Sequence, residues 1–282
     1  MIPCISQVTT LSTPFADDLP AFARAGWPAV EIWLTKLETY LQSHPIEEAR
    51  SIFVDNGIVP AGASSQGGLL LSTGDSRSAH WDLFRRRLEI LQALNVKTLV
   101  ISADFAADPT ADDFARAGGG LAEAGELAAS HGVRLALEFQ KGAKFCASLD
   151  TTLALIAQSE ARNVGVCLDL FHYYTGPSKF EDLAYLTPEN LAWVQVCDLS
   201  GVPRELAGDS DRILPGDGDF QIGPIFEHLS NIGYRGHVSL EVLNPQLWSV
   251  AAPAVADAGL RAMGRLFDGL RGTAAAAPPG GV

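Results

Sequence analysis

Short runs of apolar, often β-branched residues alternate eight times with longer amphipathic stretches along this chain of 282 residues. A run such as NVGVCLDL (163–170) is almost continuously apolar, which is typical of a strand in a parallel sheet that helices cover. Eight strand–helix units in about 270 residues predict a single-domain α/β protein with a (β/α)8 TIM barrel fold. The expected strands lie at 3–11, 28–34, 58–65, 96–102, 133–139, 163–170, 191–199 and 236–243.

The stretches that follow these strands predict helices, several of which end at a glycine. A doubly wound open sheet is the alternative, but it usually carries a glycine-rich turn after the first strand, and TTLSTPFAD (9–17) has none. We expect the barrel to occupy residues 1–270 and the segment 271–282 to form a flexible C-terminal tail. The expected helices lie at 16–26, 45–57, 79–95, 111–132, 149–160, 179–186, 221–232 and 252–270, with a long connection at 200–220.

The charge balance excludes several classes of partner. The chain has 20 basic and 33 acidic residues, a net charge of −13. Binding to nucleic acid and to anionic membranes depends mainly on Lys and Arg, so we expect neither partner. No apolar run approaches the ~18 residues of a membrane span and no signal peptide is visible, which predicts a cytoplasmic protein. The cysteines form no CxxC pair and are expected to be reduced, partly buried thiols: Cys4, Cys146, Cys167 and Cys197.

Acid or amide side chains stand at the ends of four consecutive expected strands: Glu138, Asp169, Gln195 and Glu241. In a (β/α)8 barrel the carboxyl ends of the strands surround the active site. Carboxylates that crowd together in a low dielectric repel one another unless a cation or a proton intervenes, so we expect a divalent metal. Oxygen ligands favour Mn²⁺ or Mg²⁺, with Zn²⁺ or Co²⁺ as alternatives. For any single acid, a salt bridge to a neighbouring loop is the competing explanation.

Further candidates lie beside these strand ends. His172 follows Asp169 by three residues and is expected to bond the substrate or relay a proton, unless it is an ordinary loop histidine. Arg212 lies in DSDRILPGDGDF (209–220), where its guanidinium can hold a substrate oxygen, a carboxylate or a phosphate. We interpret PGDGD as a turn that positions Arg212. Residues that can line the pocket, or equally serve packing and turns, are Glu31, Trp33 and Gln66.

The segments LALEF, VGVCLDLFHYY, VQVCD, DRILPGDGDF and IGYRGHVSLEVLNP resemble the xylose-isomerase-like sugar isomerases and epimerases, and among them most of all inosose (2-keto-myo-inositol) isomerase. The resemblance implies a divalent metal held by Glu138, Asp169, the strand-seven residue and Glu241, with both glutamates exchanging protons with the substrate. At strand seven the family has a histidine three residues before the aspartate, whereas this chain has Gln195 before Asp198. A neutral amide cannot shuttle a proton and is a poor zinc ligand, which favours Mn²⁺ or Mg²⁺.

Together these features predict a metal-dependent isomerase or epimerase of carbohydrate metabolism, acting on a small sugar or cyclic keto-polyol. The metal would polarise a carbonyl, Glu138 and Glu241 would act as acid and base through an enediolate, and His172 and Arg212 would orient hydroxyls. Three alternatives stay open. One is a lyase similar to 3-dehydroshikimate dehydratase, which Gln195 favours. The others are an endonuclease of the same superfamily, which would need several histidines and a basic surface, and a metal-free binding protein. The family also implies that subunits can form a homo-oligomer, for which the sequence shows no interface pattern.

Overall fold

Eight parallel strands form a closed barrel in the order of the chain, because the last strand pairs with the first. The computed structural model describes residues 1–276, and the side chains of residues 1–269. The predicted (β/α)8 barrel is confirmed, and the doubly wound alternative is wrong because an open sheet would leave two edge strands unpaired. The strands are β1 (Ile2–Ser6), β2 (Ala29–Trp33), β3 (Val59–Gln66), β4 (Thr98–Ser102), β5 (Arg134–Glu138), β6 (Val164–Asp169), β7 (Leu191–Val196) and β8 (His237–Leu240).

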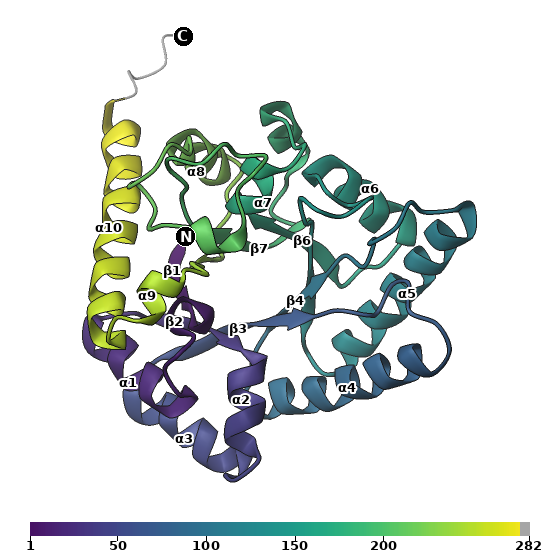
Figure 1. The fold of residues 1–282 in the computed structure, drawn as a ribbon, viewed down its shortest axis with the longest axis horizontal. Coiled ribbons are helices and arrows are strands. Elements are labelled where there is room, and N and C mark those ends of the chain that lie inside the picture. Colours follow the sequence, from purple (N-terminus) through teal and green to yellow (C-terminus); the bar gives the residue numbers. More distant parts are fainter. Residues whose placement is uncertain (277–282) are drawn as a thin grey trace.

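Helices surround the barrel and connect its strands (Figure 1). The final helix continues to Ala276, six residues into the segment expected to be a tail, and residues 277–282 lie outside the described part of the chain. The α-helices are α1 (Phe15–Ala25), α2 (Leu34–Leu41), α3 (Ile46–Asn56), α4 (Gly74–Ala93), α5 (Ala111–Ser130), α6 (Leu149–Ser159), α7 (Leu170–Thr175), α8 (Ile222–Asn231), α9 (Pro245–Trp248) and α10 (Ala252–Ala276); the 3₁₀ helices are η1 (Gln7–Thr10), η2 (Phe180–Tyr185) and η3 (Asp209–Asp211).

Several strands are shorter than their apolar patterns predict, because side chains cap a turn at their ends. The first strand was expected over 3–11 but ends at Ser6, whose hydroxyl accepts a hydrogen bond from the Val8 N–H at 3.5 Å and starts η1. Asp169 ends β6 in the same way, since its Oδ1 accepts from the Phe171 N–H at 2.7 Å and starts α7. The short helices η1, α2 and α7 therefore lie at the carboxyl ends of strands, where a barrel places its active site.

Small side chains fill the barrel interior around one large ring, that of Trp193. Its Cη2 lies 2.7 Å from the position that a Cβ would occupy at Gly62, so the strand can pass there only without a side chain. A layer of this kind is a packed core and not a pore. The interior cluster consists of Cys4, Ala29, Ala61, Val100, Ala136, Cys167 and Trp193.

The four cysteines are buried and free of disulfides, which agrees with the prediction of reduced thiols. Burial raises the pKa of each of them, so they stay protonated near neutral pH. In the described part of the chain, no helix combines the length and the apolar character needed to cross a membrane.

Candidate active site

The four predicted strand-end residues converge at one end of the barrel. Glu138 is the last residue of β5, Asp169 is the last of β6, and Glu241 directly follows β8. Gln195 on β7 pairs with Asp169 on one side and with Ser239 of β8 on the other. All four side chains are buried. We call Glu138, Asp169, Gln195 and Glu241 the carboxylate cluster.

Arg212 enters this cluster from the long β7–α8 connection. Its Nη2 lies 2.9 Å from Asp169 Oδ2 and its Nη1 lies 3.0 Å from Glu241 Oε2. The guanidinium also contacts Asp209 and lies 4.4 Å above the ring of Phe171. Arg212 is only 2% exposed, and although burial lowers its pKa, the surrounding carboxylates raise it well above the ordinary value. The guanidinium is therefore a fixed positive charge between two of the strand-end acids.

Asp198 holds the connection that carries Arg212. One carboxylate oxygen accepts from the backbone N–H groups of Leu199 and Phe220, and the other accepts from that of Gly216, all at 2.9 Å. An antiparallel backbone bridge also joins Asp198 to Ile213, the residue that follows Arg212. Asp198 thus holds both ends of the PGDGD turn and the residue after Arg212, and the positioning of Arg212 by this turn stays a prediction.

Gln195 presents its amide nitrogen, and not its oxygen, to the acids around it. The Nε2 donates to Glu241 Oε1 at 2.8 Å and to Glu31 Oε1 at 2.9 Å. The Oε1 accepts from the thiol of Cys167 at 3.1 Å. Two carboxylate acceptors fix this orientation, since an amide oxygen in the same place would face them without a proton to share. The expectation that Gln195 ligates a metal requires the amide to turn over, and it stays a prediction.

Glu31 supports the cluster from inside the barrel. Its side chain is completely buried, and burial raises its pKa, while donor groups of Ser239, Ser64, Trp193 and Gln195 offset part of this rise. The sequence suggested that Glu31 lines the substrate pocket. In the structure it reaches the strand-end acids through the amide of Gln195, which makes it a support for that side chain.

His172 faces the cluster from α7. Its Nε2 lies 4.0 Å from Glu138 Oε1 and 3.8 Å from Asp169 Oδ2. Glu138, Asp169 and His172 each offer one ligand atom, and these atoms all lie within 4.8 Å of one another. Burial lowers the pKa of His172, so the ring is neutral near pH 7 and can act as a donor or an acceptor. The cap that Asp169 forms on α7 places the histidine one helical turn away, which explains the DxxH spacing.

If all the buried acids of the cluster were ionised, their negative charge would exceed the positive charge of Arg212. Burial and the neighbouring Asp169 raise the pKa of Glu138 to about 8. Burial also raises the pKa of Glu241 well above its ordinary value, although Arg212 opposes the shift. Carboxyl groups in such a site either hold protons or attract another cation. The arrangement can therefore exchange protons with a bound molecule near neutral pH, or bind a divalent ion.

Two of the predicted pocket residues lie apart from the cluster. Gln66 accepts from Arg87 Nη1 at 3.1 Å and donates to the backbone oxygen of Gly67, which is a structural pairing at the end of β3. Trp33, at the end of β2, is partly exposed and lines a cavity next to α2. Among the described residues, neither forms a hydrogen bond or an ion pair with the strand-end acids.

The profile of the xylose isomerase-like TIM barrel family matches residues 19–266. The chain belongs to this family. It is 25% identical over 257 residues to inosose isomerase of Halalkalibacterium halodurans, covering 88% of this chain and 90% of the relative. It is also 25% identical over 256 residues to 3-dehydroshikimate dehydratase of Pseudomonas aeruginosa, covering 90% of this chain but 40% of that protein.

The solved structures lead to the same fold. The crystal structure of IolI, which contains a bound zinc atom, superposes with a TM-score of 0.89 at 22% identity and covers 95% of this chain and 98% of IolI. The resemblance inferred from the sequence is confirmed, and both groups of relatives are enzymes. One group isomerises and the other dehydrates, so the comparisons alone leave both reaction types in view.

Proposed function

We propose that this protein is a divalent-metal-dependent isomerase or epimerase that acts on a neutral sugar or cyclic keto-polyol through an enediolate. The observation that carries the proposal is the placement of Glu138 and Glu241 at one barrel mouth, on strands separated by β6 and β7. Burial raises the pKa of both carboxyl groups, which suits them to take and return protons near neutral pH. The similarity to inosose isomerases over nearly the whole chain supports this reaction class.

The residues present fit a divalent ion. Asp169 Oδ2 is completely buried and, apart from its ion pair with Arg212, has no hydrogen-bond donor in the described part of the chain. Glu138, Asp169 and Glu241 would hold the ion, with Gln195 as the fourth ligand once its amide turns over. Oxygen donors favour Mn²⁺ or Mg²⁺, and the zinc in IolI keeps Zn²⁺ as the alternative. When bound, such an ion supplies Lewis-acid polarisation of a carbonyl, worth several kcal/mol.

The protein side chains carry the proton transfers. One of Glu138 and Glu241 takes the proton from the carbon next to the carbonyl, and the other returns a proton to the adjacent carbon or to the opposite face. His172, neutral because it is buried, hydrogen-bonds a substrate hydroxyl. Arg212 balances the negative charge that develops on the enediolate, since its guanidinium already lies between Asp169 and Glu241.

A lyase of the 3-dehydroshikimate dehydratase type is the second candidate, and Gln195 at strand seven favours it. The same enediolate would then lose water from the β-carbon. That substrate carries a carboxylate, which needs a cation. Arg212 contacts the cluster but already directs its donors to Asp169, Glu241 and Asp209. We therefore place the neutral keto-polyol first.

The decisive experiment combines metal content with proton exchange. The purified protein is analysed for bound metal and then incubated in heavy water with Mn²⁺ and a panel of inososes and ketoses, with mass spectrometry as the readout. We expect deuterium to enter the substrate, and we expect Glu138→Gln and Glu241→Gln each to abolish this exchange. Near-normal exchange in either variant would show that the scheme with two glutamates is wrong.

Two controls sharpen the result. Glu89→Gln changes an exposed glutamate on α4 and should leave exchange at the wild-type rate. Incubation with 3-dehydroshikimate, followed by the ultraviolet absorbance of an unsaturated product, tests the lyase. Product formation there without exchange into any keto-polyol would replace the isomerase by the dehydratase.

A further inference from the structure

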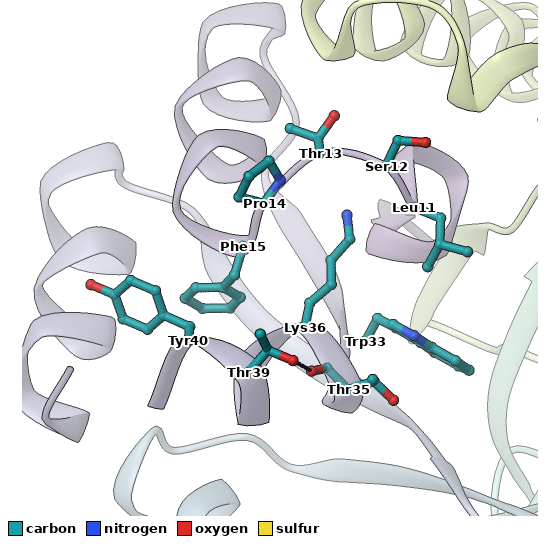
Figure 2. Close-up of a pocket in the computed structure, with 10 residues that line it drawn as sticks. All are labelled: Leu11, Ser12, Thr13, Pro14, Phe15, Trp33, Thr35, Lys36, Thr39 and Tyr40. Atoms are coloured by element: carbon teal, nitrogen blue, oxygen red, sulfur yellow. Dashed lines mark hydrogen bonds between the residues drawn. The ribbon is translucent and has the colours of Figure 1, made fainter. Parts of the chain in front are cut away.

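A separate cavity of about 380 Å³ lies beyond the carboxyl ends of β1 and β2, between the β1–α1 loop and α2. Its size falls within the range of small-molecule sites, roughly 300–1,000 Å³. Figure 2 shows Lys36 in the middle of the lining residues, with Phe15 and Tyr40 on one side and Trp33 on the other. The lining consists of residues 11–15 together with Trp33, Thr35, Lys36, Thr39 and Tyr40.

Lys36 gives this cavity a hydrogen-bond donor whose positive charge faces a buried acid, Asp18. Its Nζ lies 2.5 Å from Asp18 Oδ2 and donates to the backbone oxygen of Thr10 at 2.7 Å. Thr10 in turn donates its hydroxyl to Asp18 Oδ1 at 2.7 Å. An ammonium has three N–H groups, and the third has no acceptor among the described residues. Burial raises the pKa of Asp18 to about 7, so above that pH its carboxylate offsets the lysine charge and the pair attracts a phosphate or a carboxylate only weakly.

The walls combine aromatic rings with free hydroxyl groups. The rings of Phe15 and Tyr40 pack with centroids 5.2 Å apart and a tilt of 39°. The hydroxyls of Ser12 and Thr35 are exposed at the rim and form no hydrogen bond with other described residues, whereas that of Thr39 is bound to the Thr35 backbone oxygen (Figure 2). A sugar or cyclitol ring has an apolar C–H face and a rim of hydroxyls, which matches aromatic walls and neutral donors.

Trp33 of the cavity and Glu31, which reaches the carboxylate cluster through Gln195, belong to the same strand. It lies two residues beyond Glu31 on β2, so both side chains point to the same side of the strand, about 7 Å apart along it. Glu31 contacts Gln195, which contacts Glu241. The backbone N–H of Trp33 donates to Gln7 Oε1 at 3.2 Å, and the Gln7 amide approaches Asp18 at 3.4 Å. The floor of the cavity and the base of the cluster are thus tied to the same strand.

We propose that this cavity is a second subsite, which binds a neutral hydroxylated ring attached to the ring that reacts at the carboxylate cluster. The part that concerns the reacting ring rests on the function proposed above; the binding of a neutral ring in the cavity does not. It follows that substrates with two rings, such as an O-glycosylated keto-polyol, fit the enzyme better than a single ring does.

The test is binding of methyl β-D-glucopyranoside, measured by saturation-transfer NMR and calorimetry. Thr35→Trp and Ser12→Trp each place an indole at the cavity rim from an exposed position, so the fold should be retained. Gln42→Trp, exposed just after α2 and outside the cavity, is the matched control. We expect Thr35→Trp and Ser12→Trp to weaken binding at least tenfold and Gln42→Trp to leave it unchanged.

The same measurements distinguish this inference from the proposed function. In the Glu138→Gln background, which should lack proton exchange, methyl β-D-glucopyranoside should still bind, and Thr35→Trp should still weaken that binding. Absence of glucoside binding, equal binding in wild type and both rim variants, or displacement of the glucoside by millimolar inorganic phosphate would each overturn the subsite. Absence of proton exchange in the wild-type protein, with rim-sensitive glucoside binding intact, would instead count against the proposed reaction and leave the subsite standing.

Discussion

Replacement of Arg212 by methionine tests how the cluster balances its charge. The substitution keeps a long, buried side chain but removes the guanidinium that lies 2.9 Å from Asp169 and 3.0 Å from Glu241. Both partners are buried, and loss of one member of a buried ion pair costs about 3–5 kcal/mol. The pair with Asp209 is half exposed and adds little. We therefore expect the free energy of unfolding of the metal-free protein to fall by about 3 kcal/mol or more.

A divalent ion should offset this loss. If Arg212 and the ion neutralise the same carboxylates, Mn²⁺ will bind the Arg212→Met variant more tightly than the wild type. An ion present at 100 times its dissociation constant stabilises a fold by about 2.7 kcal/mol, so a tenfold gain in affinity adds about 1.4 kcal/mol. The stability gap between variant and wild type should therefore narrow measurably when Mn²⁺ replaces chelator.

Urea unfolding followed by tryptophan fluorescence, with chelator and with Mn²⁺, measures both effects. Arg86→Met, which changes an exposed arginine on α4, should stay within about 0.5 kcal/mol of wild type in both conditions. A metal-free Arg212→Met protein as stable as wild type would refute the buried ion-pair arrangement. Equal stabilisation of both proteins by Mn²⁺ would show that the ion and the guanidinium do not share ligands.

Three further predictions concern the residues around the cluster. Gly218→Ala places a Cβ 2.4 Å from Asp198 Oδ1 and should lower activity at least tenfold, whereas Gly223→Ala, with open space around it, should be neutral in the same activity and melting assays. Because the pKa of Glu138 is raised to about 8, the metal-free folded state keeps a proton that the unfolded chain releases. Its free energy of unfolding should therefore fall between about pH 4.5 and pH 8, and less steeply in Glu138→Gln, as urea titrations at each pH will show. Glu31→Leu removes an acceptor that holds the Gln195 nitrogen toward the acids, so the amide should turn over more easily and calorimetry should show tighter Mn²⁺ binding than in the wild type.

The sequence could predict the barrel and the meeting of Glu138, Asp169 and Glu241 because both follow from one regularity. Parallel strands in a closed barrel end on the same side, so an acid at the end of each apolar run must face a shared mouth. The position of Arg212 was also predictable, since it follows strand seven and the barrel leaves its long loops at that end. The burial of Arg212 was not predictable, because it depends on the path of the loop, which Asp198 holds through hydrogen bonds from the backbone.

The short helices and the second cavity had no comparable signal. LTKLETYL (34–41) continues the apolar end of β2, so the pattern gave no boundary between strand and helix. Asp18 lies in the first turn of α1, where an acid is normally solvated and favourable to the helix dipole. Its burial against Lys36 arises from the packing of α1 beside α2, and burial raises its pKa to about 7. The Asp18–Lys36 pair and the cavity beside it depend on contacts between α1 and α2, which cannot be inferred from sequence periodicity.

The sequence does not determine the orientation of the Gln195 amide, and this orientation decides whether Gln195 can ligate a metal. An amide can ligate through oxygen or donate through nitrogen, and the choice depends on Glu31, 164 positions away, and on Cys167. With its nitrogen toward Glu241, the amide donates a hydrogen bond that partly neutralises that carboxylate, but it presents no oxygen ligand to a cation. With the oxygen turned inward, Glu31 and Glu241 would lose a donor and would need a proton or the cation itself to replace it. We therefore expect the Gln195 amide to turn over when the metal binds. If Gln195→Leu leaves the metal affinity unchanged, the Gln195 oxygen is not a ligand and its orientation is independent of metal binding.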